Sequence, residues 1–263
     1  MPDTSDYLDA FHAEAAALAA AARPGLAEPV PTCPGWTMAT LVTHMIRLYA
    51  HRIQLIRLRA RENTVRGFDG LGLPAPFKEW FETRPEDLSR LPSGLLELFE
   101  QSAAGLEGIL RATDPAVPVW TFWPPDQTAG FWVRRMTLET AIHRWDAQHA
   151  RGAAQPISAE LARDGIDEFL DIMLHVARQR KEPRPGGGEV YHLHRTDGEG
   201  EWMLRFEGGG ASVAHEHGKG DVAVRGSASD LLLFLWGRIP ADQLEVFGDA
   251  TLLTRFFDLV PPL

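Results

Sequence analysis

The chain has little cysteine, no long apolar run and no excess of positive charge. The one cysteine among 263 residues, Cys33, excludes an intramolecular disulfide and fits a reducing compartment. The longest strongly apolar run, at residues 231–236, is far too short to cross a bilayer. The acidic start lacks the cationic and apolar segments of a signal peptide. We therefore expect a cytoplasmic protein with no membrane partner.

Acidic residues outnumber basic ones, with 36 Asp and Glu against 26 Lys and Arg, which gives a net charge of −10 at pH 7. Proteins that bind nucleic acids need a basic surface for the phosphates, so this balance argues against a nucleic-acid partner. The glycine triplets at 186–188 and 208–210 do not follow the strand–GxGxxG–helix pattern, which excludes a dinucleotide site of that type. The charge is explained by solubility alone.

The first 152 residues read as a helical bundle. Alanine-rich or amphipathic segments with N-capping residues and Gly or Pro stops predict long helices. Helices of these lengths with these connections favour a four-helix bundle. The stretch 62–92 is mixed with Gly and Pro and reads as a long loop with short helical pieces. The predicted helices span 3–23, Thr37 to about 61, Ser93 to about 112, and about 128 to 150.

After residue 153 the chain changes character. A helix capped by Ser158 runs to about 179, and short strand-like runs separated by Gly-rich turns follow. This pattern indicates an antiparallel meander or hairpins. We expect an α+β fold overall, with a helical domain at 1–152 and a smaller α+β domain at 153–263. The predicted strands are 189–196, 201–208, 211–218, 221–226 and 244–249, with further helices at 228–238 and 250–260.

One helical stripe carries a carboxylate, an imidazole and a second carboxylate. Glu139 and His143 are four residues apart and Asp146 is three further on, so all three share one face. His44 lies on the apolar side of another helix. Bundle cores build metal sites from inward-facing side chains of different helices, and two imidazoles with one carboxylate leave an open position on zinc. A satisfied core histidine in a polar network is the other interpretation.

Four segments, in this order, resemble the mycothiol-dependent maleylpyruvate isomerase family: CPGWTMATLVTHM, LETAIHRWDAQ, VRGSASDLLLFLWGR and LEVFGD. The resemblance covers nearly the whole chain. It implies a DinB-like four-helix bundle followed by a sterol-carrier-like α+β domain. It also implies a divalent metal, usually zinc, held by His44, Glu139 and His143. The arginine that the second domain of the family contributes is best matched by Arg238.

The resemblance also implies a reaction and its partners. In the family, the thiolate of mycothiol adds to the cis double bond of maleylpyruvate, the resulting single bond rotates, and elimination gives fumarylpyruvate and returns the thiol. An arginine can hold a substrate carboxylate with two hydrogen bonds. The implied partners are therefore a small thiol and a small anionic or electrophilic substrate. Thiol S-transfer is the second implied reaction, and a small-molecule carrier or regulatory binding protein with a structural or absent metal is the alternative.

Four further residues near these motifs are candidates for a role at the site. Asp146 either orients a metal ligand from outside the coordination sphere or forms a salt bridge. Arg135 precedes Glu139 by four residues and can pair with it. His51 shares the face of His44 and is a reserve ligand. Cys33 stands just before a helix N-terminus, where a thiolate could be stabilised, but no base partner is visible in the sequence, and a buried structural thiol is the favoured interpretation.

Paired histidines suggest a second metal site. His192 with His194, and His215 with His217, are spaced so that each pair faces one side of a strand. Two such pairs on neighbouring strands would form a histidine-rich site in the C-terminal domain. The alternative is a solvent-facing sheet surface. A separate aromatic group either lines a pocket near the metal or anchors a loop by burial; its members are Trp120, Phe122, Trp123, Phe131 and Trp132.

Overall fold

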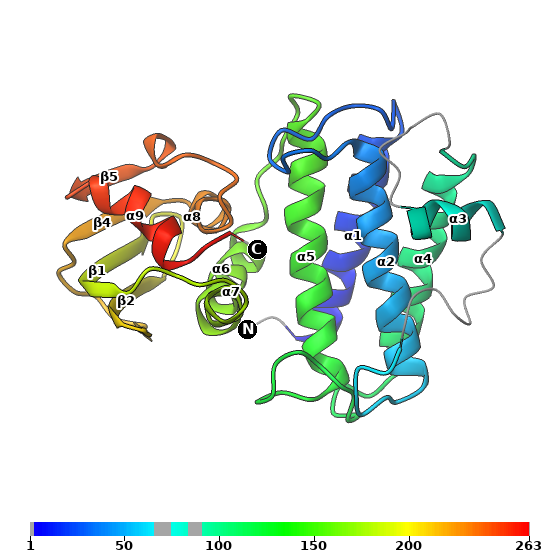
Figure 1. Cartoon of the computed structure of the whole chain (residues 1–263), viewed down its shortest axis with the longest axis horizontal. Helices are drawn as coiled ribbons and strands as arrows, with labels where there is room; N and C mark the ends of the chain where they lie inside the picture. The colour runs from blue at the N-terminus through cyan, green and yellow to red at the C-terminus, as the bar shows by residue number, and fades with distance from the viewer. Residues whose placement is uncertain (1–2, 66–74, 84–90, 263) are drawn as a thin grey trace. The chain divides into compact units, whose positions relative to one another are not determined.

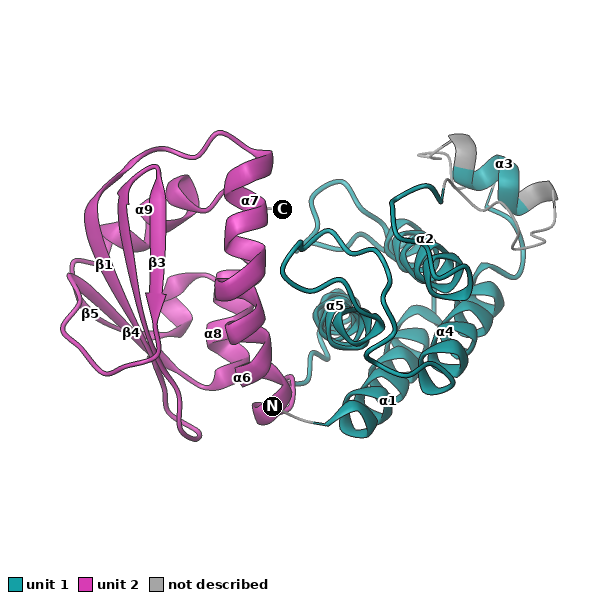
Figure 2. Ribbon diagram, turned by 90° about the horizontal axis from the view of Figure 1, so that it is seen from below, with its two compact units in different colours: residues 1–155 teal, residues 156–263 magenta. Residues whose placement is uncertain are grey.

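The computed structural model describes residues 3–65, 75–83 and 91–262. The chain divides into two compact units, residues 1–155 and 156–263 (Figure 2). The expected α+β fold, with a helical first part and a smaller sheet-containing second part, is confirmed. The assignment of 1–152 and 153–263 to two functional domains stays a prediction. In the described part of the chain, none of the helices combines the length and apolar character that crossing a bilayer requires.

Unit 1 is a bundle of long helices (Figure 1). Helix α1 packs against α4 and α5, and α2 packs against the same two helices. Asp3, Thr37 and Thr128 cap the helices that follow them, because each side chain accepts a hydrogen bond from a backbone N–H of the first turn. The bundle helices are α1 (Thr4–Ala22), α2 (Met38–Arg57), α4 (Leu95–Arg111) and α5 (Ala129–His149).

Two details of unit 1 differ from the sequence-based prediction or complete it. Helix α4 begins at Leu95 rather than Ser93, because Gly94 has a positive φ of 84° that a helix does not continue from. The short helix α3 (Ala75–Thr83) lies within the predicted loop 62–92, as expected. The rest of that prediction falls partly on residues 66–74 and 84–90, which lie outside the described residues.

Unit 2 contains a sheet with the strand order β3-β2-β1-β4-β5 among the described residues. The predicted meander is wrong for β4, which pairs with β1 in parallel, whereas the other neighbours are antiparallel. In this pairing Val222 and Val224 of β4 lie beside Tyr191 and Leu193 of the central strand β1. All four side chains are buried, so β4 extends the apolar face of β1. The strands are β1 (Gly186–Arg195), β2 (Glu201–Gly208), β3 (Gly210–Ala214), β4 (Val222–Gly226) and β5 (Glu245–Gly248).

Helices cover one face of this sheet. Trp202 of β2 is fully buried and donates to Asp167 Oδ1 at 2.7 Å, and the rings of Tyr191 and Phe206 contact Phe256. Because side chains alternate along a strand, the intervening residues of β1 and β2 face the opposite side. The covering helices are α6 (Ala159–Glu168), a π-helical turn (Phe169–Met173), α7 (Leu174–Arg180), α8 (Ala228–Leu235) and α9 (Thr251–Leu259).

Candidate metal centre

A histidine–glutamate cluster lies between α2 and α5. His44 comes from α2, and Glu139 and His143 come from α5. Nε2 of His44 and Nε2 of His143 each lie 3.4 Å from Oε1 of Glu139. One ligand atom from each residue lies within 4.8 Å of the others. Two ligands ~2.1 Å from a tetrahedral ion are ~3.4 Å apart, so these residues fit a divalent metal.

Asp146 positions the imidazole of His143. Its Oδ2 lies 2.9 Å from Nδ1 of His143, which leaves Nε2 directed at Glu139. The carboxylate of Asp146 is fully buried and accepts hydrogen bonds from Thr32 Oγ1 at 2.6 Å and Cys33 Sγ at 3.5 Å. The sequence shows no partner for Cys33, but the fold provides one. Asp146 thus has the contacts of a residue that orients a metal ligand from behind.

The other oxygen of Glu139 is held by an arginine. Arg135 is buried and its Nη2 donates to Oε2 of Glu139, which confirms the predicted pairing. Oε1 is left facing the two imidazoles. Burial alone would raise the pKa of Glu139, but Arg135 and the hydrogen bonds from both histidines hold that pKa well below its usual value. The site therefore contains an ionised carboxylate.

The two imidazoles differ electrostatically. Burial lowers the pKa of His44, which favours the neutral ring with a free lone pair. Burial acts in the same direction on His143, but hydrogen bonds with Asp146, Cys33 and Glu139 outweigh it and hold the pKa of His143 well above its usual value. The raised pKa favours a protonated ring, so a metal ion that binds His143 would displace a proton from it.

Trp36 forms an aromatic wall beside the cluster. Its ring centroid lies 5.0 Å from that of His44 and 6.0 Å from that of His143, the latter in a stacked arrangement. The side chain of His44 is 31% exposed whereas that of His143 is 6% exposed, so the cluster is more open on the His44 side. Sequence reasoning missed Trp36, although it stands inside the quoted CPGWT motif.

Other predicted residues lie outside this cluster. His51 is two turns further along α2, where Nε2 lies 3.0 Å from Asn63 Oδ1, so the reserve-ligand interpretation is wrong. Arg238 belongs to unit 2, is half-buried, and donates from Nη1 to the Trp236 carbonyl at 2.9 Å. Its proposed catalytic role stays a prediction.

The aromatic group packs on itself. Phe122, Phe131 and Trp132 meet in edge-to-face contacts with centroid distances of 5.1 to 5.7 Å. Trp132 is fully buried and its Nε1 donates to the Trp120 carbonyl at 2.9 Å. These contacts favour loop anchoring by aromatic burial over a pocket lining. Arg52 lies over the Trp132 ring, with Cζ 4.4 Å from its centroid.

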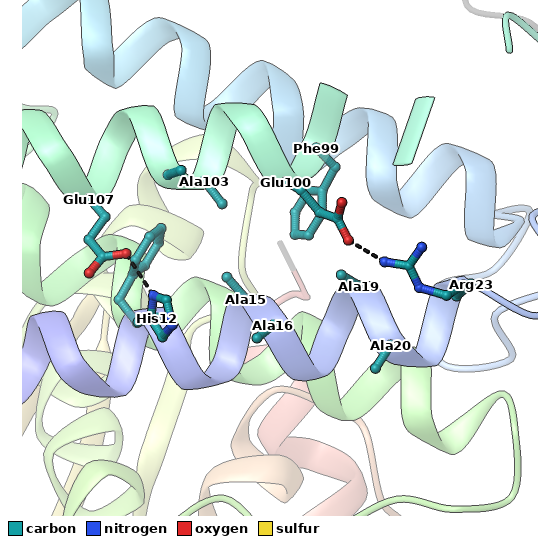
Figure 3. Close-up of a pocket in the computed structure, with 12 residues that line it drawn as sticks. His12, Ala15, Ala16, Ala19, Ala20, Arg23, Phe99, Glu100, Ala103 and Glu107 are labelled. Carbon is teal, nitrogen blue, oxygen red and sulfur yellow. Dashed lines mark hydrogen bonds and ion pairs between the residues drawn. The ribbon is translucent and has the colours of Figure 1, made fainter. Parts of the chain in front are cut away.

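A groove of about 270 Å³ lies between α1 and α4 (Figure 3). It is bordered at one end by His12 with Glu107 and at the other by Arg23 with Glu100. Among its described lining residues, none belongs to the cluster of His44, Glu139 and His143. The groove is therefore separate from the candidate metal centre.

The predicted histidine pairs of unit 2 are only partly brought together. Strand β3 ends at Ala214, so the prediction that His215 and His217 lie on a strand is wrong. His215 Nδ1 lies 3.6 Å from Asp167, whereas His217 joins His192, His194 and Glu201 in a second cluster.

Comparison with known proteins gives the family. Residues 8–148 match the family described as the mycothiol maleylpyruvate isomerase N-terminal domain, and residues 160–255 match the MDMPI C-terminal domain. No curated protein matches the chain. A crystal structure of the mycothiol-dependent maleylpyruvate isomerase is 18% identical and that of a mutant is 17% identical; each match covers 93% of both chains with a TM-score of 0.61. These two structures share the fold. Because the first family match spans more than half of its residues, the chain belongs to the mycothiol maleylpyruvate isomerase family.

Proposed function

We propose that the protein is a mycothiol-using enzyme whose divalent metal, zinc, is held by His44, Glu139 and His143. Its reaction is the addition of the thiol to a small electrophilic substrate, as in the cis–trans isomerisation of maleylpyruvate. Family membership supports the thiol and the isomerisation. Thiol S-transfer is the second reaction of this type. The cytoplasmic location stays a prediction.

One observation carries the metal proposal. Two imidazole Nε2 atoms from different helices approach the same oxygen of Glu139, each at 3.4 Å. The remaining nitrogen of His143 and the remaining oxygen of Glu139 already have partners in Asp146 and Arg135. Three protein ligands leave a coordination position open, as in catalytic zinc sites. Bound zinc supplies Lewis acidity, which lowers the pKa of a thiol and makes it nucleophilic at neutral pH.

The chain's own residues have defined tasks in this proposal. Asp146 holds the ring of His143 in one orientation. Trp36 supplies apolar surface beside both rings, which reduces the access of water. We propose that Arg238 binds a substrate carboxylate with two parallel hydrogen bonds. Replacement by lysine keeps the charge but removes the planar pair of donors, so Arg238→Lys is expected to raise KM for an anionic substrate.

Elemental analysis tests the metal proposal. Wild type is compared with His44→Ala and Glu139→Gln, and His51→Ala is the matched control because His51 lies on the same helix but outside the cluster. We expect both cluster variants to lose one equivalent of zinc relative to wild type and control. Loss of mycothiol-dependent isomerisation of maleylpyruvate should accompany it.

Two outcomes would contradict the proposal. Activity that persists in a variant without the metal would exclude the zinc-dependent mechanism. Equal zinc content in wild type and both cluster variants would leave Glu139 as the buried partner of Arg135 in a polar network. A small-molecule carrier or regulatory binding protein would then be the better interpretation.

A further inference from the structure

A second cluster of imidazoles lies on the sheet of unit 2. His192 and His194 alternate along β1 with Tyr191 and Leu193, which are buried in the core. The two histidines therefore face away from the helices. Glu201 of β2 is the direct register partner of His194. Two strands thus place two imidazoles and a carboxylate on the same face of the sheet.

The segment 215–221 adds a third imidazole. It connects β3 to β4, and the strand order requires it to pass β2 and β1. A Cβ added at Gly218 would lie 3.2 Å from Met203 Sδ, and one added at Gly220 would lie 2.9 Å from the Val190 carbonyl oxygen. The segment therefore runs close against β1 and β2, and at Gly220 any side chain would collide with backbone atoms. This path places His217 over the cluster.

The four side chains converge on one point. His192 Nε2 lies 2.7 Å and His217 Nδ1 lies 2.6 Å from Oε2 of Glu201, and His194 Nδ1 lies 3.1 Å from Oε1. One nitrogen or oxygen of each residue lies within 4.8 Å of the others. The side chain of His192 is 7% exposed, whereas that of His217 is 78% exposed. The cluster thus has one buried imidazole, His192 on β1, and one exposed imidazole, His217 on the crossover segment.

We propose that His192, His194, Glu201 and His217 form a binding site for a divalent metal ion, and that the ion is zinc. Imidazole and carboxylate are both zinc ligands, and three imidazoles with one carboxylate would supply the four ligands of a closed tetrahedral site. Magnesium and calcium prefer oxygen ligands throughout, so the three nitrogens select against them. The ion would tie the crossover segment 215–221 to β1 and β2.

The alternative is a hydrogen-bond network in which Glu201 accepts from all three rings. A single imidazole would be enough to pair with the carboxylate of Glu201, but the fold brings three imidazoles to it from two separate chain segments. Opening the present contacts of 2.6 to 3.1 Å to the ~3.4 Å between tetrahedral ligands needs only a small outward shift. Glu201 and His217, whose side chains are 25% and 78% exposed, can make that shift while the buried His192 stays in place.

Zinc titration against a chromophoric chelator tests the proposal on the full chain. The test variant is His194→Ala/His217→Ala, whose two side chains are 29% and 78% exposed, so we expect it to fold, as checked by circular dichroism. The matched control is His215→Ala, which changes the same segment outside the cluster. Wild type and control should bind one more zinc per chain than the double variant. His217→Ala alone should weaken this binding by more than about 10-fold. Equal zinc stoichiometry and affinity in wild type and double variant would overturn the proposal.

Tryptic cleavage at Lys219 gives a second readout. Lys219 is exposed in the crossover segment, and a metal that ties this segment down would slow the cleavage. Zinc should protect wild type and His215→Ala but not the double variant. His143→Ala should keep this protection, because the two clusters share no residue. Cleavage of wild type at the same rate with and without zinc would overturn the proposal, whatever the outcome at His44, Glu139 and His143.

Discussion

Asp146 shows how one side chain can join segments that are distant in sequence. It lies on α5, three residues after His143, but its carboxylate also accepts from Thr32 and Cys33, more than 110 residues away. These buried contacts favour the orienting role, which stays a prediction, over the surface salt bridge that the sequence also allows. A carboxylate held on both oxygens has one orientation, and so does the imidazole that it contacts.

Replacement of Asp146 by asparagine is expected to weaken zinc binding at the first cluster by about 10- to 100-fold, because an amide no longer offers two anionic acceptors to His143 and the loop. Zinc titration of Asp146→Asn beside wild type measures this. Thr32→Val, which removes only one donor to Asp146, serves as a control with a smaller expected effect. Unchanged affinity in Asp146→Asn would show that His143 needs no support from this side.

At the scale of elements, the helices that carry the ligands are set by their ends. Thr37 and Thr40 form a capping box at the start of α2, two turns before His44. Thr128 caps α5 in a similar way. Because capping depends on residues within one turn, it is readable from sequence, and the predicted starts of α2 and α5 are confirmed. The predicted start at Ser93 is wrong because Gly94 turns the backbone there.

Thr37→Ala should lower the free energy of unfolding by about 1 kcal/mol, since a backbone N–H at the start of α2 loses its acceptor. Denaturant unfolding measures the change. Thr37→Ser keeps the hydroxyl and should stay close to wild type. If serine and alanine at position 37 destabilise equally, the cap does not support α2.

The contact between α1 and α4 should depend on pH through Glu107. Burial raises the pKa of Glu107, but hydrogen bonds with His12 and Arg111 outweigh it and lower the pKa below its usual value of 4.5. A depressed folded-state pKa contributes stability above pH 4.5 that is lost as pH falls through the lower, folded-state value. The Tm advantage of wild type over Glu107→Gln should therefore shrink between pH 7 and pH 3. A Tm difference that is constant over this range would contradict the prediction.

At the scale of the whole molecule, each unit has a core of its own. Unit 1 buries the facing sides of its helices, including Phe11, Tyr49 and Phe99, and unit 2 buries Trp202 and Phe256 between sheet and helices. Both units exceed the size below which a domain needs disulfides or metals to fold.

Residues 1–155 and 156–263, produced as separate chains, are each expected to unfold cooperatively in a thermal melt. Each fragment should also bind one zinc, through His44, Glu139 and His143 in the first and through the second cluster in the other. A fragment without a cooperative transition would show that its core depends on the other unit. Circular dichroism and chelator titration give the two readouts.

Local signals suffice to predict much of this protein, including the long helices, the α+β class and the stripe of Glu139, His143 and Asp146. Caps and apolar periodicity act over a few residues, so they are visible in the chain itself. The position of His44 on the apolar face of its helix, together with the family motif, predicts that it lies near Glu139 and His143. The structure brings these three residues together.

Contacts between distant segments settle the rest. The parallel pairing of β4 with β1 depends on which strand packs beside the buried central strand of the sheet. A short strand carries little information about its partner. The same crossover takes His217 to the second cluster and leaves His215 outside it. Thr32, Trp36 and Cys33 join the first cluster only because their loop folds onto α2 and α5. Such partnerships arise from the packing of whole elements, which no local pattern encodes.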